Sequence, residues 1–174
     1  LPLKQELQGR GCEFASETDS EIMAHLVALE TKEGKNLEDA VRSALTKVEG
    51  AYAFVVQSEA EPQRLVLAKN ASPIVIGFGE DESFVASDIP ALLAHTRTFA
   101  FLEDGQMAVV EAGKVTATTL AGEPVELKPR TVDWSPAVAE KNGHKHYMHK
   151  EIFEQPTAIA DTLRGRAQLE AADV

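Results

Sequence analysis

The feature that most constrains the fold of this chain is a change of hydrophobic period at Gly50. Before it, apolar residues recur every three or four positions in segments 19–33 and 37–48, which predicts two amphipathic helices. Gly34 follows the first segment as a C-cap, and Asn36 precedes the second as an N-cap. We expect the two helices to be antiparallel and to share one core.

After Gly50 the apolar runs are short, rich in β-branched residues and separated by turn residues, which predicts a strand meander. The expected strands are 51–57, 65–69, 74–78, 83–86, 98–102, 107–111 and 114–118. Three further elements are expected: the tail of a helix at 3–8, a strand at 12–15, and a short helix at 87–95 capped by Ser87 or Asp88. Together these patterns predict an α+β fold.

The C-terminal part of the chain has a different character. Residues 119–143 contain Pro and Gly with little periodicity, which predicts a connector that leaves the sheet, with Trp134 as a packing anchor. Helical segments are expected at 148–153 and 157–166, separated by Pro156. We therefore expect one domain over 1–135, and over 136–174 a linker with the opening of a second domain.

Charge and cysteine content exclude several functions. The chain has 28 acidic and 17 basic residues and a net charge of −11, which would repel nucleic acid and an anionic membrane surface. No apolar run approaches the roughly 20 residues that cross a bilayer, and the N-terminus has no export signal, so we expect a cytoplasmic protein. The single cysteine, Cys12, excludes an internal disulfide and a zinc site built from several thiolates.

The motif Ser-Glu-Thr-Asp-Ser-Glu at 16–21 opens the first long helix. One interpretation is a capping box, in which Thr18 is the N-cap and Glu21 reaches back to its amide. A compatible functional interpretation is that Asp19, facing the positive end of the helix dipole, accepts a ligand ammonium group.

Three other motifs favour structural roles. Gly77-Phe-Gly79 precedes three acidic residues and predicts a hairpin turn rather than a phosphate site. The residues His144, His146 and His149 with Glu151 match no zinc spacing, so a basic linker is favoured over a metal site or a phosphosugar contact. Cys12 has no recognisable histidine partner and is expected to be a packed thiol. We expect no metal site and no cofactor.

The sequence resembles the glucosamine-6-phosphate synthase family of class II glutamine amidotransferases, from Leu1 to about Arg166. The residues that carry the resemblance are Ser16–Glu21, Gly50-Ala-Tyr-Ala-Phe, Ala71–Gly77, Ala86-Ser-Asp88, Phe101–Gly105 and His146–Pro156. The last segment is the most specific, because in this family it joins the glutaminase domain to the sugar isomerase domain. The resemblance implies an N-terminal nucleophile (Ntn) hydrolase fold, an αββα sandwich of antiparallel sheets between helical layers, of which this chain would be the later part.

The resemblance also implies a function. The family hydrolyses glutamine and transfers the ammonia to fructose 6-phosphate, giving glucosamine 6-phosphate. Asp19 matches the carboxylate that holds the α-ammonium group of glutamine. The family nucleophile is an N-terminal Cys, whereas this chain opens on Leu1. We therefore expect a fragment with no catalytic residue of its own and no activity alone, in which fructose 6-phosphate would be bound only through a missing isomerase domain.

Two alternatives remain at this stage. One is a non-catalytic binding or regulatory module on the amidotransferase scaffold, and the other is a deglycase-like relative. A partial sandwich should also leave an apolar face uncovered, so we expect a homo-oligomer.

Overall fold

The computed structural model describes residues 2–111, 113–133 and 144–163, and these fall into two units, one within Leu1–Trp134 and one within Ser135–Val174. The expected domain boundary at 135/136 and the expected anchor Trp134 lie outside the described residues.

Three helices open the first unit: α1 (Pro2–Gly9), α2 (Ser20–Lys32) and α3 (Leu37–Leu45). The predicted cap of α3 is confirmed, because Asn36 Oδ1 accepts a hydrogen bond of 2.9 Å from the Asp39 amide. The strand expected at 12–15 is wrong. The Ala15 amide donates to the Glu21 side chain rather than to a neighbouring strand, so this segment cannot join a ladder there.

The strands form two antiparallel sheets. The five-stranded sheet has the order β1-β2-β6-β7-β8, and the four-stranded sheet has the order β4-β3-β5-β9. The bounds are Tyr52–Ser58 for β1, Glu61–Asn70 for β2, Val75–Phe78 for β3, Ser83–Ala86 for β4, Thr98–Phe101 for β5, Gln106–Glu111 for β6, Lys114–Thr119 for β7, Pro124–Val125 for β8 and Arg130–Thr131 for β9.

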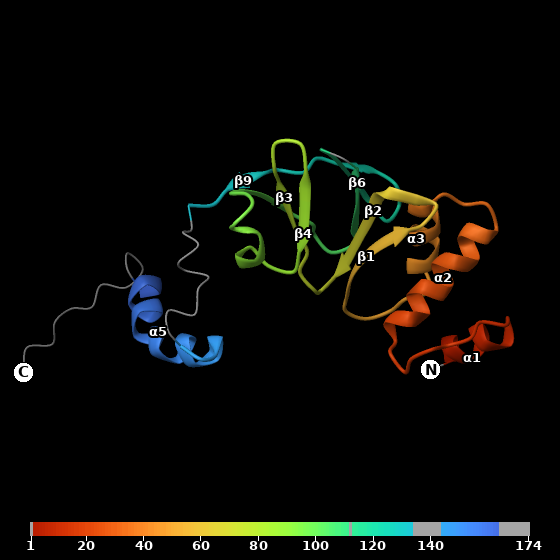
Figure 1. Cartoon of the computed structure of the whole chain (residues 1–174), viewed down its shortest axis with the longest axis horizontal. Helices are drawn as coiled ribbons and strands as arrows, with labels where there is room; N and C mark the ends of the chain where they lie inside the picture. The colour runs from red at the N-terminus through yellow and green to blue at the C-terminus, as the bar shows by residue number, and fades with distance from the viewer. Residues whose placement is uncertain (1, 112, 134–143, 164–174) are drawn as a thin grey trace, which may run out of the picture. The chain divides into compact units, whose positions relative to one another are not determined.

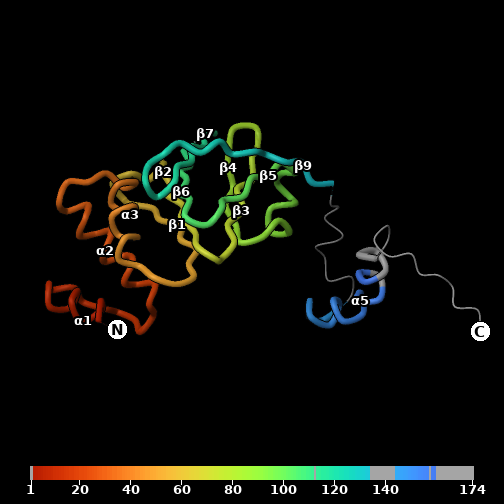
Figure 2. The backbone as a smooth tube through the Cα atoms, turned by 180° about the vertical axis from the view of Figure 1, so that it is seen from behind, coloured from red at the N-terminus to blue at the C-terminus, as the bar shows by residue number. Residues whose placement is uncertain are grey.

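The first unit is layered, with the helices on one face of the five-stranded sheet and the four-stranded sheet against the other face (Figure 1, Figure 2). Alternation along β2 and β6 creates this arrangement, since successive strand residues point to opposite faces. Val66 and Val109 pack against the helices, whereas Leu67 and Val110 pack between the sheets. Both faces of these central strands are therefore buried, and the antiparallel α+β sandwich expected from the sequence is confirmed. Among the described residues, the helical layer covers the five-stranded sheet.

Several expected elements differ from those observed. The segment expected to be a connector contains β8 and β9. Each strand has two residues and a Pro within it or directly before it, so no alternation of apolar and polar residues predicts it. The short helix is a single 3-10 turn, Pro90–Leu92, with the Ala91 amide donating to Asp88.

The second unit contains α5 (Tyr147–Leu163), one helix that runs through Pro156 instead of the two expected segments. Proline removes one amide donor, and the helix bends along its course (Figure 1). Within the parts of the chain that the structure describes, no helix combines the length and apolar character needed to cross a membrane.

Candidate functional site

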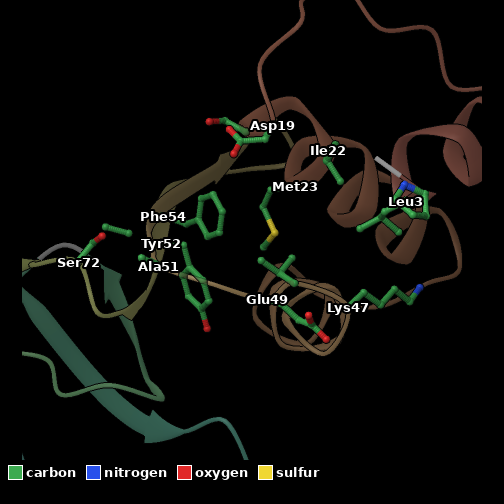
Figure 3. Close-up of a pocket in the computed structure, with 14 residues that line it drawn as sticks. Leu3, Asp19, Ile22, Met23, Lys47, Glu49, Ala51, Tyr52, Phe54 and Ser72 are labelled. Atoms are coloured by element: carbon green, nitrogen blue, oxygen red, sulfur yellow. The ribbon is translucent and has the colours of Figure 1, made fainter.

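A cavity of about 780 Å³ lies beside the outer strand β1, between that strand and the helices α1 and α2. The residues that line it come from four segments of the first unit: Pro2, Leu3, Asp19, Ser20, Ile22, Met23, Lys47, Val48, Glu49, Ala51, Tyr52, Ala53, Phe54 and Ser72. Figure 3 shows Met23 extending from α2 into the cavity, whose lining also includes Asp19 and the aromatic residues Tyr52 and Phe54 of β1. The cavity thus combines apolar side chains with charged groups at Lys47 and Glu49 and with a carboxylate at the start of a helix.

Asp19 is the N-terminal flanking residue of α2, yet its side chain makes no capping hydrogen bond. The backbone has helical angles at this position (φ −70°, ψ −26°), whereas a capping residue is usually extended. Asp19 is exposed and lines the cavity. The expected capping box centred on Thr18 is wrong, because neither Thr18 nor Asp19 caps α2 through its side chain.

Glu21 anchors the segment before α2 instead. Its Oε1 accepts the Ala15 amide at 2.7 Å, and its Oε2 accepts the Ser16 amide at 2.8 Å and the Ser16 hydroxyl at 2.5 Å. The Ser16 hydroxyl, followed by the Ala15 amide, lowers the pKa of Glu21 from 4.5 to about 2. Glu21 therefore stays ionised at neutral pH and fixes the loop that leads to Asp19.

A second layer of contacts supports this loop. His25 packs against Phe14 with ring centroids 4.4 Å apart, and Lys4 lies over the same Phe14 ring and donates to the Ser16 carbonyl at 3.1 Å. The buried Nε2 of His25 is 3.6 Å from Glu21 Oε1, too far for a hydrogen bond, and has no hydrogen-bond partner among the described residues. The loop is held from α1 and from α2.

Local contacts also stabilise the part of the cavity wall that is formed by β1 and the turn at residues 71–72. Tyr52 stacks on Phe54 at 5.2 Å, and burial, followed by the nearby Asp104 charge, raises the pKa of Tyr52. Ala71, with a positive φ of 58°, donates its amide to Asp104 at 2.8 Å. An alanine in this region is strained by about 1 kcal/mol, so Asp104 stabilises the turn that places Ser72 against the cavity.

Lys47 connects the cavity to the helical core. Its ammonium group lies 3.3 Å from Oε1 of buried Glu30, whose other oxygen binds Lys35. Hydrogen bonds first from Lys35 and then from Ser43, with a further one from Lys47, lower the pKa of Glu30 to about 2. This cluster joins the end of α2 to α3 and to the segment that follows α3.

The other residues singled out in the sequence lie elsewhere. Cys12 is half-buried against the helical core and does not line the cavity, so the expected packed thiol is observed, although not in a strand. Gly79 lies in the β3–β4 hairpin turn and donates to the Glu82 carbonyl at 2.8 Å, as expected. His144 and His149 contact each other through Nδ1 atoms 2.9 Å apart. Among the described residues, no group of three or more metal-ligating side chains occurs.

Chemically, the cavity offers a free carboxylate, a lysine, a glutamate and two aromatic rings, and no thiol. It suits the binding of a small ligand with a cationic group near Asp19. The sequence singled out Asp19, but not Lys47, Glu49, Tyr52 or Ser72. Lys47 and Glu49 come from the segment between α3 and β1, and Tyr52 and Ser72 come from β1 and the 71–72 turn, so tertiary packing brings them to the cavity.

Comparisons with known proteins agree with this architecture. Residues 1–94 match the model of the glutamine amidotransferase domain family. The chain is 48% identical over 174 residues to glutamine–fructose-6-phosphate aminotransferase (isomerizing) of Thermus thermophilus, covering 100% of this chain and 28% of that protein. It is 49% identical over 164 residues to the protein of the same name from Symbiobacterium thermophilum, covering 94% of this chain and 27% of the relative.

Among solved structures, the chain is similar to glutamine phosphoribosylpyrophosphate amidotransferase of B. subtilis, solved with ADP and GMP, with a TM-score of 0.59 and 25% sequence identity. The match covers 71% of this chain and 27% of that one. The chain therefore spans just over a quarter of the length of these relatives. The Ntn-hydrolase-type fold and the resemblance drawn from the motifs are confirmed, and the chain belongs to the glutamine amidotransferase family.

Proposed function

We propose that this chain is part of the glutaminase domain of an enzyme that transfers the amide nitrogen of glutamine to fructose 6-phosphate, giving glucosamine 6-phosphate. The observation that carries the proposal is the free carboxylate of Asp19 on the wall of the cavity, in a chain that belongs to the amidotransferase family. The sugar substrate is inferred from the two relatives described above, which are both named glutamine–fructose-6-phosphate aminotransferase (isomerizing).

In this proposal Asp19 binds the α-ammonium group of glutamine. A carboxylate that makes no capping bond has its lone pairs available, and a charge-assisted hydrogen bond to an ammonium group is about twice as strong as a neutral one. The clasp formed by Glu21 with Ala15 and Ser16 fixes the approach to Asp19, so little loop ordering is needed when the ligand binds.

The isolated chain is proposed to be inactive. Attack on the glutamine amide requires a nucleophile beside the bound amide, and the only cysteine of the chain, Cys12, is packed against the helical core and does not line the cavity. The nucleophile and the residues that bind the sugar phosphate would come from other parts of a longer polypeptide, since the relatives are more than three times as long.

The experiment is to graft residues 1–174 into the Thermus thermophilus relative in place of the aligned segment. We expect the grafted enzyme to hydrolyse glutamine and to form glucosamine 6-phosphate. In it, Asp19→Asn should lower kcat/KM for glutamine about 10- to 100-fold, mainly through KM, because a charged hydrogen bond contributes about 1.5–3 kcal/mol.

Glu17→Gln is the matched control, because Glu17 is an exposed carboxylate of the same loop that does not line the cavity. It should leave KM unchanged. A grafted enzyme that uses free ammonia but not glutamine would contradict the proposal, and so would glutamine turnover by the isolated chain.

A further inference from the structure

One ring nitrogen of His25, on α2, is buried and unpaired. Its Nε2 has no hydrogen-bond partner among the described residues and lies 3.6 Å from Glu21 Oε1. Residues of the first unit themselves bury this nitrogen, so a further segment of a longer polypeptide could not reach it without displacing them. The ring also packs against Phe14, with the centroids 4.4 Å apart. Because a buried polar atom without a partner costs free energy, this nitrogen gains most by forming a hydrogen bond to its nearest acceptor, Glu21.

The charged groups that face His25 determine the effect of protonating it. Glu21 lies one turn before it on α2, and the ammonium group of Lys4, from α1, lies over the Phe14 ring. Glu21 stays ionised at neutral pH, because hydrogen bonds, first from the Ser16 hydroxyl, lower its pKa to about 2. The charge of a histidine ordinarily changes between pH 5 and 8, and a cation four residues after a glutamate on a helix forms a favourable pair. Oε1 of Glu21 accepts one backbone amide and has a second lone pair for an Nε2–H donor.

Glu21 acts on Asp19 through the loop before α2. The Ser16 hydroxyl donates to Glu21 Oε2, so the Thr18 hydroxyl, 2.8 Å away, must donate to Ser16 Oγ. The Thr18 amide donates to the same oxygen at 3.3 Å, and Thr18 directly precedes Asp19. A continuous set of hydrogen bonds therefore runs from Glu21 to the residue beside the cavity carboxylate, and the bonds in such a chain strengthen one another.

We propose that His25 is a positioning residue for glutamine binding, an inference that rests on the function proposed above for Asp19. In the protonated imidazole, Nε2 donates to Glu21 Oε1, and the gap of 3.6 Å closes to hydrogen-bond distance. This bond holds the Glu21 carboxylate and tightens its clasp on residues 15 and 16. Asp19 then lies at the end of a more ordered loop, so less ordering remains when the ligand binds.

Loss of the imidazole proton removes the bond to Glu21 and loosens the loop. The imidazolium charge is paired with the Glu21 carboxylate, so it adds little net charge near the ligand ammonium group. We therefore expect Asp19 to bind the ammonium group more tightly on the acid side of the His25 titration than on the basic side.

Hydrogen exchange and NMR of the 174-residue chain test the coupling without any ligand. The protection factors of the Ala15 and Ser16 amides should fall about two- to fivefold as pH rises from 5 to 8, the effect of losing one partly exposed ion pair. The midpoint should equal that of the His25 Hε1 shift, measured in the same samples. Protection that does not change across the His25 titration, or that rises with pH, would overturn the proposal.

His25→Gln is the test variant, because glutamine retains a polar side chain that does not titrate. It should abolish the pH-dependent step in the protection of the two amides. His95→Gln is the matched control, since His95 is exposed and stacks on Phe84 of β4, and it should preserve the step. A step that persists in His25→Gln would contradict the role of His25, and if that variant does not fold, the titration of the parent chain decides.

The grafted enzyme described above tests the effect on glutamine. The ratio of KM in His25→Gln to KM in the parent should be about two- to fivefold larger at pH 6 than at pH 8, with an unchanged ratio of kcat. The ratio cancels the pH dependence of the nucleophile, which both enzymes share. Glutamine turnover with a pH-independent KM ratio would overturn the role of His25 alone. A pH-dependent clasp in a grafted enzyme that does not use glutamine would instead overturn the proposed function.

Discussion

The two longest helices of the first unit begin in different ways. α3 begins with Asn36, whose side chain accepts the Asp39 amide. α2 begins with Asp19, whose side chain caps nothing, while Glu21 accepts the Ala15 and Ser16 amides from inside the helix. The difference shows how a carboxylate at a helix start becomes available to a ligand. Glu21 holds the segment before α2, so the side chain of Asp19 is left without a capping hydrogen bond.

The largest expected effect is on the pH dependence of the free energy of unfolding. The pKa of Glu21, like that of buried Glu30, is lowered from 4.5 to about 2. Each carboxylate therefore binds fewer protons in the folded chain than in the unfolded chain between these values, so its stabilising contribution is complete above pH 4.5 and is lost as pH falls through about 2. The free energy of unfolding, measured by urea titration, should fall over this window, and Glu30→Gln should reduce the slope. An unchanged slope in that variant would contradict the assignment.

Replacing Glu21 tests which residue anchors the start of α2. Glu21→Gln should increase hydrogen exchange of the Ala15 and Ser16 amides, since the substituted side chain has no charged acceptor. In the parent chain, the NMR shifts of these amides should titrate with a midpoint near pH 2, as expected from the pKa of Glu21. A midpoint near 4.5 would show that the clasp does not form in solution.

Replacing Asn36 tests the ordinary cap. Asn36→Ala should lower the free energy of unfolding by about 1 kcal/mol, because the Asp39 amide loses its acceptor. Chemical denaturation provides the measurement, and Asn36→Asp, which can still accept, should restore most of the loss.

The smallest effect is expected at Asp19. Asp19→Ala should change the free energy of unfolding by less than about 0.5 kcal/mol, because its side chain makes no capping bond. If this variant were as unstable as Asn36→Ala under the same denaturation conditions, Asp19 would be a structural cap and the difference between the two helices would disappear.

Much of the fold was predictable because local patterns determine it. Helical spacing in segments 19–33 and 37–48 and strand alternation after Gly50 led to elements that match the structure within a few residues. The failures have identifiable causes. β8 and β9 are too short to show a hydrophobic period. α5 continues through Pro156, although a proline in the sequence usually predicts that a helix ends before it.

For the site, the sequence and its family resemblance singled out Asp19, which lies on the cavity, and predicted that Cys12 is a packed thiol, because both inferences depend on neighbouring residues and motifs. The sequence alone also determined the net charge of −11 and the uncharged composition of β1. Only the tertiary structure decided that Glu21 holds the Ala15 and Ser16 amides, and that Tyr52 and Ser72 share a cavity with Asp19. The physical reason is that periodicity specifies which face of an element is buried, whereas strand order and side-chain partners depend on contacts between distant segments.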